Sequence, residues 1–515
     1  MIESARHPEF DRFVRYDKSE RSMLLPAVFI MAVAVLSLVL ITFGLADGVL
    51  KIERPYLIPW VIATGIAFTI PVVILSRRGE LKFTNPIVYP LITYFVPVFF
   101  LGGWSLAFGL SNYFYLNYVS DPRLDFPLAF VYIIVGFAAL CTGYFIPQGK
   151  RIGDSLNRFL PKWDFSPAEI VISSSVFLFL GYSVNLLALE LGQLGYQMGD
   201  ITYGTTGSMA FFLAMMLPAT TFLLWLAFFR LEKWSYLHLI IIAAQLTTVG
   251  FTLLISGGKS SFLQNAIMLI GSFVMTRDRI KLKHWTIFAL IVVASVIAGT
   301  IYGSKFRDLK GTANRVSIDE YSAIAVESIG SVGSSDISSQ MTDSFYLLAN
   351  RLETVSALAV VVSNYDALAP YEAAYGLDTS IWTYTWTAFI PRFLWKDKPL
   401  VSDGSSFNDL YFDNPGFGLS LTVMGDLLIN FGPIGVPLGM ILLGIGIRVL
   451  YATLIEGKPF ISWRAAIYFV VLTQISYDAF YGSIFPNVIR VAFVVALQIV
   501  TMRMIVKFFL RTHRA

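Results

Sequence analysis

The chain has 515 residues, of which 56% are hydrophobic and only 14% are charged. Soluble proteins carry about 25% charged residues, so this composition excludes a soluble globular protein and predicts a polytopic membrane protein. The net charge of +4 is small, and we expect no nucleic-acid partner. The single cysteine, Cys141, excludes a disulfide within the chain.

Apolar segments of membrane-spanning length recur along the chain. A helix needs about 20 residues to cross a bilayer. Residues 24–46 are long enough, and they exceed the apolar core of a cleavable signal, so we expect a retained first helix. The twelve predicted spans are 24–46, 56–75, 87–108, 127–146, 168–190, 210–230, 237–256, 262–276, 285–303, 432–454, 465–482 and 488–509. The predicted fold class is an all-α, polytopic integral membrane protein with about twelve transmembrane helices and one large, partly helical periplasmic loop.

The distribution of lysine and arginine predicts the orientation, because cytoplasmic segments are enriched in basic residues. Most of these residues fall in the alternate segments that share one side of the membrane with the N-terminus. We therefore expect both termini in the cytoplasm. The predicted parts are a cytoplasmic tail (1–23), transmembrane helices one to nine (24–303), a periplasmic loop (304–431), transmembrane helices ten to twelve (432–509) and a second cytoplasmic tail (510–515).

The residue types missing from the outer face exclude several kinds of site. All four histidines are predicted on the cytoplasmic side: His7, His238, His284 and His513. This placement excludes an outward Ser-His-Asp triad and leaves the outer face without the histidine and cysteine ligands that zinc prefers. Gly258-Lys259-Ser260 is similar to the end of a phosphate-binding loop, but Leu253 stands where that motif needs its first glycine. We expect no metal, no cofactor and no nucleotide site.

Basic residues on the outer face are candidate anion ligands. Lys259 lies in a Gly-Gly turn between two apolar helices, where exposed backbone amides favour an anion. In segment 388–399, Arg392, Lys396 and Lys398 fall among aromatic residues, a pattern typical of the membrane interface. The alternatives are a simple tight turn for the first site and interfacial anchoring alone for the second.

Two outer carboxylates are candidates for a general base. Asp426 is a lone acid in an apolar run at the predicted outer boundary, where a carboxylate is costly unless it is paired or functional. Asn430, four residues on, is expected to share its helix face. Glu353 lies in a predicted helix over 347–358, with Arg351 on a different side. The alternatives are an acid favoured by a helix dipole for Asp426 and solvated surface charges for Glu353 and Arg351.

Two motifs of the long loop carry a resemblance to a known family. They are Pro391-Arg392-Phe-Leu-Trp395-Lys-Asp-Lys398-Pro399 and Gly425-Asp426-Leu-Leu-Ile-Asn430-Phe431-Gly432. Together with twelve spans and a large outward loop before the last three, this pattern resembles the O-antigen (Wzy-type) polymerases, which join oligosaccharide repeat units of bacterial surface polysaccharides. The turn around Lys259 is similar to a Gly-Ser-Arg-like turn of that family, with lysine in place of arginine. Many relatives have glutamate where Asp426 stands.

The resemblance implies a glycosyltransferase of the bacterial inner membrane that acts at the periplasmic face without a cofactor. It would transfer the growing glycan from undecaprenyl diphosphate to a hydroxyl of the next lipid-linked repeat unit. Asp426 and Glu353 are then the candidate catalytic bases. The implied diphosphate ligands are Arg351, Arg392, Arg307, Lys259 and Lys398, and the implied sugar or acceptor ligands are Asn430, Tyr411, Trp395 and Asp403. The expected partners are undecaprenyl-diphosphate-linked repeat units, membrane lipids and a chain-length regulator.

Three other functions stay open at this point. An O-antigen ligase typically uses a histidine in the outward loop, and this loop has none. A GT-C-type lipid-phosphate-dependent glycosyltransferase usually has acidic residues in its first outward loop. Asp47 and Glu53 are present there, but the chain has no Asp-x-Asp motif. A transporter or flippase predicts charges within the spans and broken helices at matching places in two halves; the spans carry few ionisable residues and no halves match.

Overall fold

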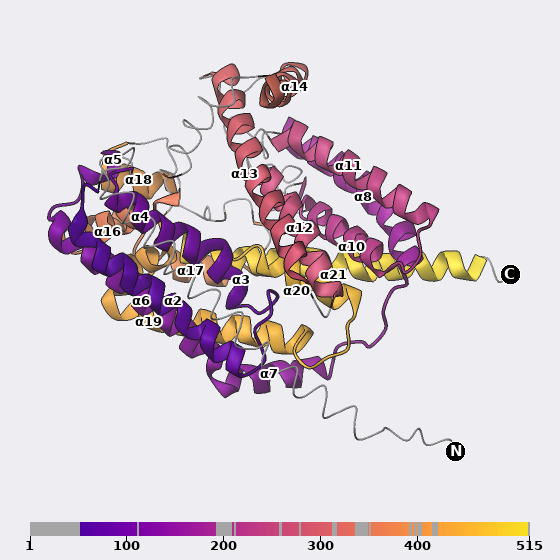
Figure 1. Ribbon diagram of the computed structural model, residues 1–515, viewed down its shortest axis with the longest axis horizontal. Coiled ribbons are helices and arrows are strands. Elements are labelled where there is room, and N and C mark those ends of the chain that lie inside the picture. The colour runs from indigo at the N-terminus through magenta and orange to yellow at the C-terminus, as the bar shows by residue number, and fades with distance from the viewer. Residues whose placement is uncertain are drawn as a thin grey trace.

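The computed structural model describes residues 52–110, 113–191, 209–210, 213–256, 260–277, 280–311, 317–334, 349, 352–390, 394–395, 398, 404–414 and 421–512. Every regular element within these ranges is a helix, which confirms the all-α part of the predicted fold class (Figure 1). The first predicted span, 24–46, lies outside the described residues.

Eight helical segments of the described residues are long and apolar enough to cross a membrane. They are η1 (Pro55–Leu57) with α2 (Ile58–Arg77); α3 (Val88–Pro90), η2 (Leu91–Leu101) and α4 (Gly102–Ala107) together; α6 (Pro122–Phe145); α8 (Pro167–Glu190); α11 (Tyr236–Ser256); α13 (Leu282–Lys310); α19 (Val423–Leu454); and α21 (Tyr481–Thr512). Three shorter apolar helices occupy further predicted spans: α10 (Met216–Arg230), α12 (Ser260–Thr276) and α20 (Ser462–Leu472). These helices are those of a membrane protein.

The remaining helices connect the apolar ones. They are α5 (Tyr113–Leu116), α7 (Pro147–Asn157), α14 (Ile318–Ser334), α16 (Val355–Glu372), η3 (Ala373–Tyr375), α17 (Ser380–Thr387) and α18 (Gly404–Phe412). The long loop is therefore partly helical, as predicted. In Figure 1, α4, α5, α16 and α18 gather at one end of the body that contains α2, α6 and α19. The pair α13 and α14 stands apart from that end, and α14 packs on α11 and α13.

Glycines allow α6 and α19 to pack closely against each other in this body. A Cβ atom at Gly143 would lie 2.1 Å from the Ile441 carbonyl oxygen, and one at Gly444 would lie 2.2 Å from the Leu140 carbonyl oxygen. The two backbones therefore touch. Small residues permit such close approach, and close packing is a main source of helix association in a bilayer. This contact fixes the position of α19, which carries Asp426.

Several predicted helix boundaries are wrong: α6 begins at Pro122 and not at 127, α13 ends at Lys310 and not at 303, and α21 begins at Tyr481 and not at 488. Three further differences bear on the site. The sequence predicts span ten from residue 432, but α19 already begins at Val423, where the Thr422 hydroxyl accepts the Gly425 N–H at 3.2 Å. The helix bends at Gly432, whose φ of 67° favours glycine. Span eleven is predicted to reach 482, but α20 ends at Leu472, before a polar segment that includes the locally bonded Ser476 and Asp478. The helix predicted over 347–358 also differs, because Glu353 and Thr354 are non-helical and α16 begins at Val355.

Candidate functional site

Asp426 is buried in the first turn of α19, with only 2% of its surface exposed. Its Oδ1 accepts a hydrogen bond from Asn430 Nδ2 at 3.1 Å, and its Oδ2 accepts one from the Gly482 N–H at 2.9 Å. The Tyr481 N–H also donates to this carboxylate. Because Tyr481 and Gly482 are the first residues of α21, the carboxylate lies at the positive end of that helix dipole. The expected contact between Asp426 and Asn430 is present.

Asn430 ties this carboxylate to α17. Its Oδ1 accepts the Ile381 N–H at 3.1 Å, and its Nδ2 also lies 3.2 Å from Ser380 Oγ. The approach of α17 to α21 is close, because a Cβ at Gly482 would lie 3.0 Å from the Tyr384 ring. Asp426 and Asn430 therefore form a polar node that joins the starts of α17, α19 and α21.

Glu353 occupies a comparable position at the start of α16. Its Oε1 accepts the Ser356 N–H at 2.7 Å, and its Oε2 accepts the Ser356 hydroxyl. The side chain is buried, and a Cβ at Gly102 of α4 would lie 3.1 Å from the Glu353 Cα. Burial raises the pKa of Glu353 to about 7, against the opposing effects of the Ser356 hydrogen bonds, the Val355 N–H and the Arg54 guanidinium. A carboxyl group that titrates near neutral pH suits a general base.

This pKa makes the stability of the fold depend on pH. Folded Glu353 keeps its proton up to about pH 7, whereas the unfolded chain releases it near 4.5. The contribution of this group is therefore complete below pH 4.5 and is lost as the pH rises through about 7. The loss approaches roughly 3 kcal/mol. We expect Glu353→Gln, which does not titrate, to lose this part of the pH dependence of Tm in the full-length protein in detergent.

The matched control is Glu327→Gln, which changes an exposed glutamate of α14. It should keep the wild-type dependence of Tm on pH. A Glu353→Gln profile that falls with pH as steeply as the wild-type profile would show that Glu353 is not a buried carboxyl group with a raised pKa.

Tyr411, a predicted sugar ligand, is buried in α18. Its hydroxyl donates to Glu372 Oε1 at 2.7 Å, and Glu372 is the last residue of α16. Burial raises the pKa of both groups, and the shared hydrogen bond favours the ionised form of Glu372. In this structure the tyrosine hydroxyl therefore links α18 to α16.

An exposed aromatic ledge lies on α17 and the residues that follow it. Its large exposed side chains are Trp382 (69%), Trp386 (47%), Phe389 (67%) and Leu394 (72%). Trp395, a predicted sugar ligand, is partly buried and contacts Trp386, with ring centroids 5.6 Å apart. Lys398, a predicted diphosphate ligand, is buried and donates to the Ile390 carbonyl at 2.9 Å. The ledge thus lies on the helix that binds Asn430.

Of the remaining predicted ligands, the structure describes Arg307. Arg307 lies in the last turn of α13, and its Nε donates to the Gly303 carbonyl at 2.9 Å. In Figure 1 this end of α13 stands apart from α16 and α18. Four predicted ligands lie outside the described residues: Arg351, Arg392, Lys259 and Asp403. In the described part of the chain, no three His, Cys, Asp or Glu side chains are grouped as metal ligands.

Sequence reasoning missed the partners of the two carboxylates. Gly482 and Ser380 meet Asp426 and Asn430 across more than 45 residues of sequence, and no local motif marks them. Arg54 faces Glu353 from the other end of the chain. A serine three residues after Glu353 is the one local signal, because the Ser356 N–H and hydroxyl both donate to its carboxylate.

Residues 177–411 match a family described as a domain of unknown function (DUF8712). The match runs from within α8 to within α18, so it includes Glu353 and Tyr411 and stops before Asp426. No curated protein and no solved structure matches the chain.

Proposed function

We propose that the protein is a polymerase of bacterial surface polysaccharide that transfers a growing glycan from undecaprenyl diphosphate to the next lipid-linked repeat unit. One observation carries the proposal: the exposed aromatic ledge and the Asp426–Asn430 node are joined through α17. Aromatic side chains suit sugars and the membrane interface, and a buried carboxylate beside them suits a hydroxyl acceptor. In the sequence, one motif that resembles the O-antigen polymerases follows α17, and the other contains Asp426 and Asn430.

The proposed glycosyl transfer needs a base for the acceptor hydroxyl and cations for the diphosphate. The acceptor hydroxyl oxygen forms a bond to the anomeric carbon of the donor, and the bond from that carbon to the lipid diphosphate breaks. The hydroxyl proton goes to the base, and the electron pair leaves with the diphosphate. The sugar–diphosphate bond is already activated, so the reaction needs no sugar nucleotide, and cations near the diphosphate stabilise its developing charge.

Asp426 is our first candidate for the base and Glu353 is the second. Asn430 Nδ2 and the Gly482 N–H each bind one oxygen of Asp426 and so fix the direction of its carboxylate. Glu353 already titrates near neutral pH and lies outside the eight candidate spans. The two carboxylates are therefore distinguishable by isosteric substitution.

We further propose twelve spans with both termini in the cytoplasm and residues 304–425 in the periplasm. This orientation follows from the lysine and arginine distribution. A phosphatase fused after Gly333, in α14, should be active, because that enzyme folds only outside the cytoplasm. A fusion after Lys281, before α13, should be inactive. The reverse pair of results would overturn the orientation and the outward placement of the site.

The proposed diphosphate ligands Arg351 and Arg392 give a direct test of the activity. Purified full-length protein should lengthen chains from undecaprenyl-diphosphate-linked repeat units, measured as a ladder on a gel. One charge-assisted hydrogen bond is worth about 1.5–3 kcal/mol, so each Arg→Ala change should slow chain growth about 10- to 100-fold. Arg→Lys should also impair growth, because lysine lacks the bidentate fork.

The control for these substitutions is Arg123→Ala, which changes an exposed arginine at the start of α6. It should leave chain growth unchanged. Normal growth by the double Arg351→Ala, Arg392→Ala variant would remove these residues from the site, and absence of growth by the wild-type protein would contradict the proposed function.

A further inference from the structure

The connecting helix α7 lies between two membrane spans. It begins two residues after α6 ends, at the corner formed by Ile146 and Pro147, and the chain re-enters an apolar helix at α8. Its glycines press it onto α19: a Cβ at Gly153 would lie 2.6 Å from the Ala452 Cβ, and one at Gly149 would lie 2.9 Å from the Arg448 Cγ. This connectivity places α7 at a membrane surface, beside the end of α19.

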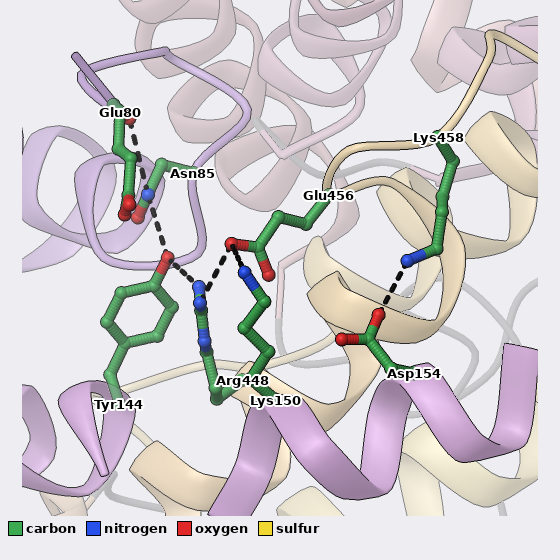
Figure 2. Close-up of polar contacts among 8 residues, drawn as sticks. All are labelled: Glu80, Asn85, Tyr144, Lys150, Asp154, Arg448, Glu456 and Lys458. Atoms are coloured by element: carbon green, nitrogen blue, oxygen red, sulfur yellow. Dashed lines mark hydrogen bonds and ion pairs between the residues drawn. The ribbon is translucent and has the colours of Figure 1, made fainter. Parts of the chain in front are cut away.

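Ion pairs fix the rotation of α7 about its axis. Lys150 Nζ lies 3.2 Å from Glu456 Oε1, and Lys458 Nζ lies 2.6 Å from Asp154 Oδ1 (Figure 2). One turn further, Asn157 Oδ1 accepts a hydrogen bond from Arg464 at 2.8 Å. One face of α7 is therefore bound to the segment between α19 and α20.

Glu456 is held in turn by Arg448 of α19. Arg448 Nη2 lies 2.9 Å from Glu456 Oε1, and its Nη1 donates to the Tyr144 hydroxyl at 2.8 Å (Figure 2). The Tyr144 hydroxyl also accepts from Asn85 at 2.9 Å. This network connects α7 to the loop after α2 as well as to α19, so α7 has a fixed face toward the protein.

The opposite face of α7 is apolar and exposed. At about 100° per residue, Ile152 and Leu156 and the following Phe159 lie on nearly the other side from Lys150 and Asp154. Their exposed fractions are 49%, 46% and 85%. The described part of the chain leaves these side chains exposed, and the neighbouring helices α6 and α8 are both candidate membrane spans.

Basic residues border the apolar stripe. Arg151, Arg158 and Lys162 are exposed, and none of them forms an ion pair with a described residue. An amphipathic helix with apolar side chains on one face and arginines beside them is typical of binding in the plane of a membrane interface. Arginine side chains at that depth reach lipid phosphate groups.

We propose that α7 is an in-plane helix that binds anionic phospholipids, with Ile152, Leu156 and Phe159 among the acyl chains and Arg151 and Arg158 on the headgroup phosphates. The charge distribution of the chain assigns this surface to the cytoplasmic leaflet. The occupant is a lipid because the apolar stripe and the arginines are adjacent and because both neighbouring helices enter the bilayer. The inference does not depend on the proposed glycosyl transfer.

The test measures lipid selectivity in the full-length protein. The protein is purified in mixed micelles that contain equal amounts of phosphatidylglycerol and phosphatidylcholine, and the retained lipids are counted by native mass spectrometry. The wild-type protein should be enriched in phosphatidylglycerol. Each basic residue near an anionic surface contributes about a five-fold preference, so Arg151→Gln with Arg158→Gln should lower the enrichment about 25-fold. The pair Arg151→Lys, Arg158→Lys should keep most of it.

Two controls make the outcome decisive. Arg123→Gln, at the start of α6, should leave the enrichment unchanged, and Phe159→Ser should reduce the retention of both lipids. Equal enrichment by the wild-type and double-glutamine proteins would overturn the proposal. Displacement of phosphatidylglycerol by millimolar glycerol phosphate would also overturn it, because the site would then be one for a soluble phosphate.

Discussion

Asp426→Asn should lower the rate of chain growth by about 10²–10⁴, the usual contribution of a general base, while lipid-substrate binding persists. The substitution keeps the shape of the side chain and removes its ability to take a proton. Asn430 Nδ2 and the Gly482 N–H donate to the two carboxylate oxygens. The asparagine amide has a single oxygen, so it can accept only one of these two hydrogen bonds in the same geometry. Protein yield and Tm therefore have to be measured beside activity, with chain growth followed on gels from lipid-linked repeat units.

Asp125→Asn is the matched control for Asp426→Asn. Asp125 is also a buried carboxylate at the start of a spanning helix, and its Oδ2 accepts the Asp121 N–H at 3.0 Å. It should lose some stability and keep chain growth. If Asp426→Asn grows chains normally and Glu353→Gln does not, Glu353 is the base. If both variants grow chains normally, neither carboxylate acts as the base.

Gly143→Leu should prevent assembly of the folded protein. The new Cβ would lie 2.1 Å from the Ile441 carbonyl oxygen, so α6 and α19 would have to separate. Overpacking a well-filled contact costs typically about 1–3 kcal/mol, and a clash with backbone rather than with a flexible side chain belongs at or above the upper end. We expect little monodisperse protein by size-exclusion chromatography in detergent, and a strongly lowered Tm for what remains.

Gly446→Leu is the control within the same helix. Gly446 is exposed on α19, and a Cβ there meets no atom within 4 Å. This variant should be purified with wild-type yield and Tm. If Gly143→Leu and Gly446→Leu behaved alike, the close α6–α19 contact would be wrong, and with it the position of Asp426.

Much of the fold follows from apolar length alone. The predicted spans 56–75, 127–146 and 168–190 correspond to η1–α2, α6 and α8, because about 20 apolar residues in a row have one stable conformation in a bilayer. Polar caps such as Asp121, which accepts the Arg123 N–H, and Ser166, which caps α8, mark the helix starts locally. At α6 the Asp121 cap marks the start at Pro122, which the apolar run alone places at 127.

The wrongly predicted boundaries of α19 and α20 lie where contacts between distant segments, and not local sequence signals, decide where a helix begins or ends. The run 423–431 is helical before the bend at Gly432, yet the sequence alone does not show that the backbone continues through that glycine. The end of α20 at Leu472 interrupts an apolar run. In the non-helical segment that follows, the Tyr477 carbonyl accepts a hydrogen bond from the Val423 N–H at the start of α19. Such pairing between distant segments has no periodic signature.

In the candidate site, too, local contacts could be predicted from the sequence and long-range contacts could not. The contact from Asn430 to Asp426 is a four-residue helical spacing, so it could be predicted. The donors from Gly482 and the bond from Asn430 to Ile381 depend on how α17, α19 and α21 meet. Arg307 lies in the last turn of α13, which packs on α14, so its surroundings also depend on contacts between helices.

The surface polysaccharide of a strain that lacks this gene tests the central claim most directly. A polymerase joins repeat units before they are attached, so its loss should leave single repeat units on the surface, seen on a gel as one band in place of a ladder. Wild-type protein should restore the ladder, and the Asp426→Asn protein should not. An unchanged ladder in the deletion strain, or the absence of any attached polysaccharide, would contradict the account.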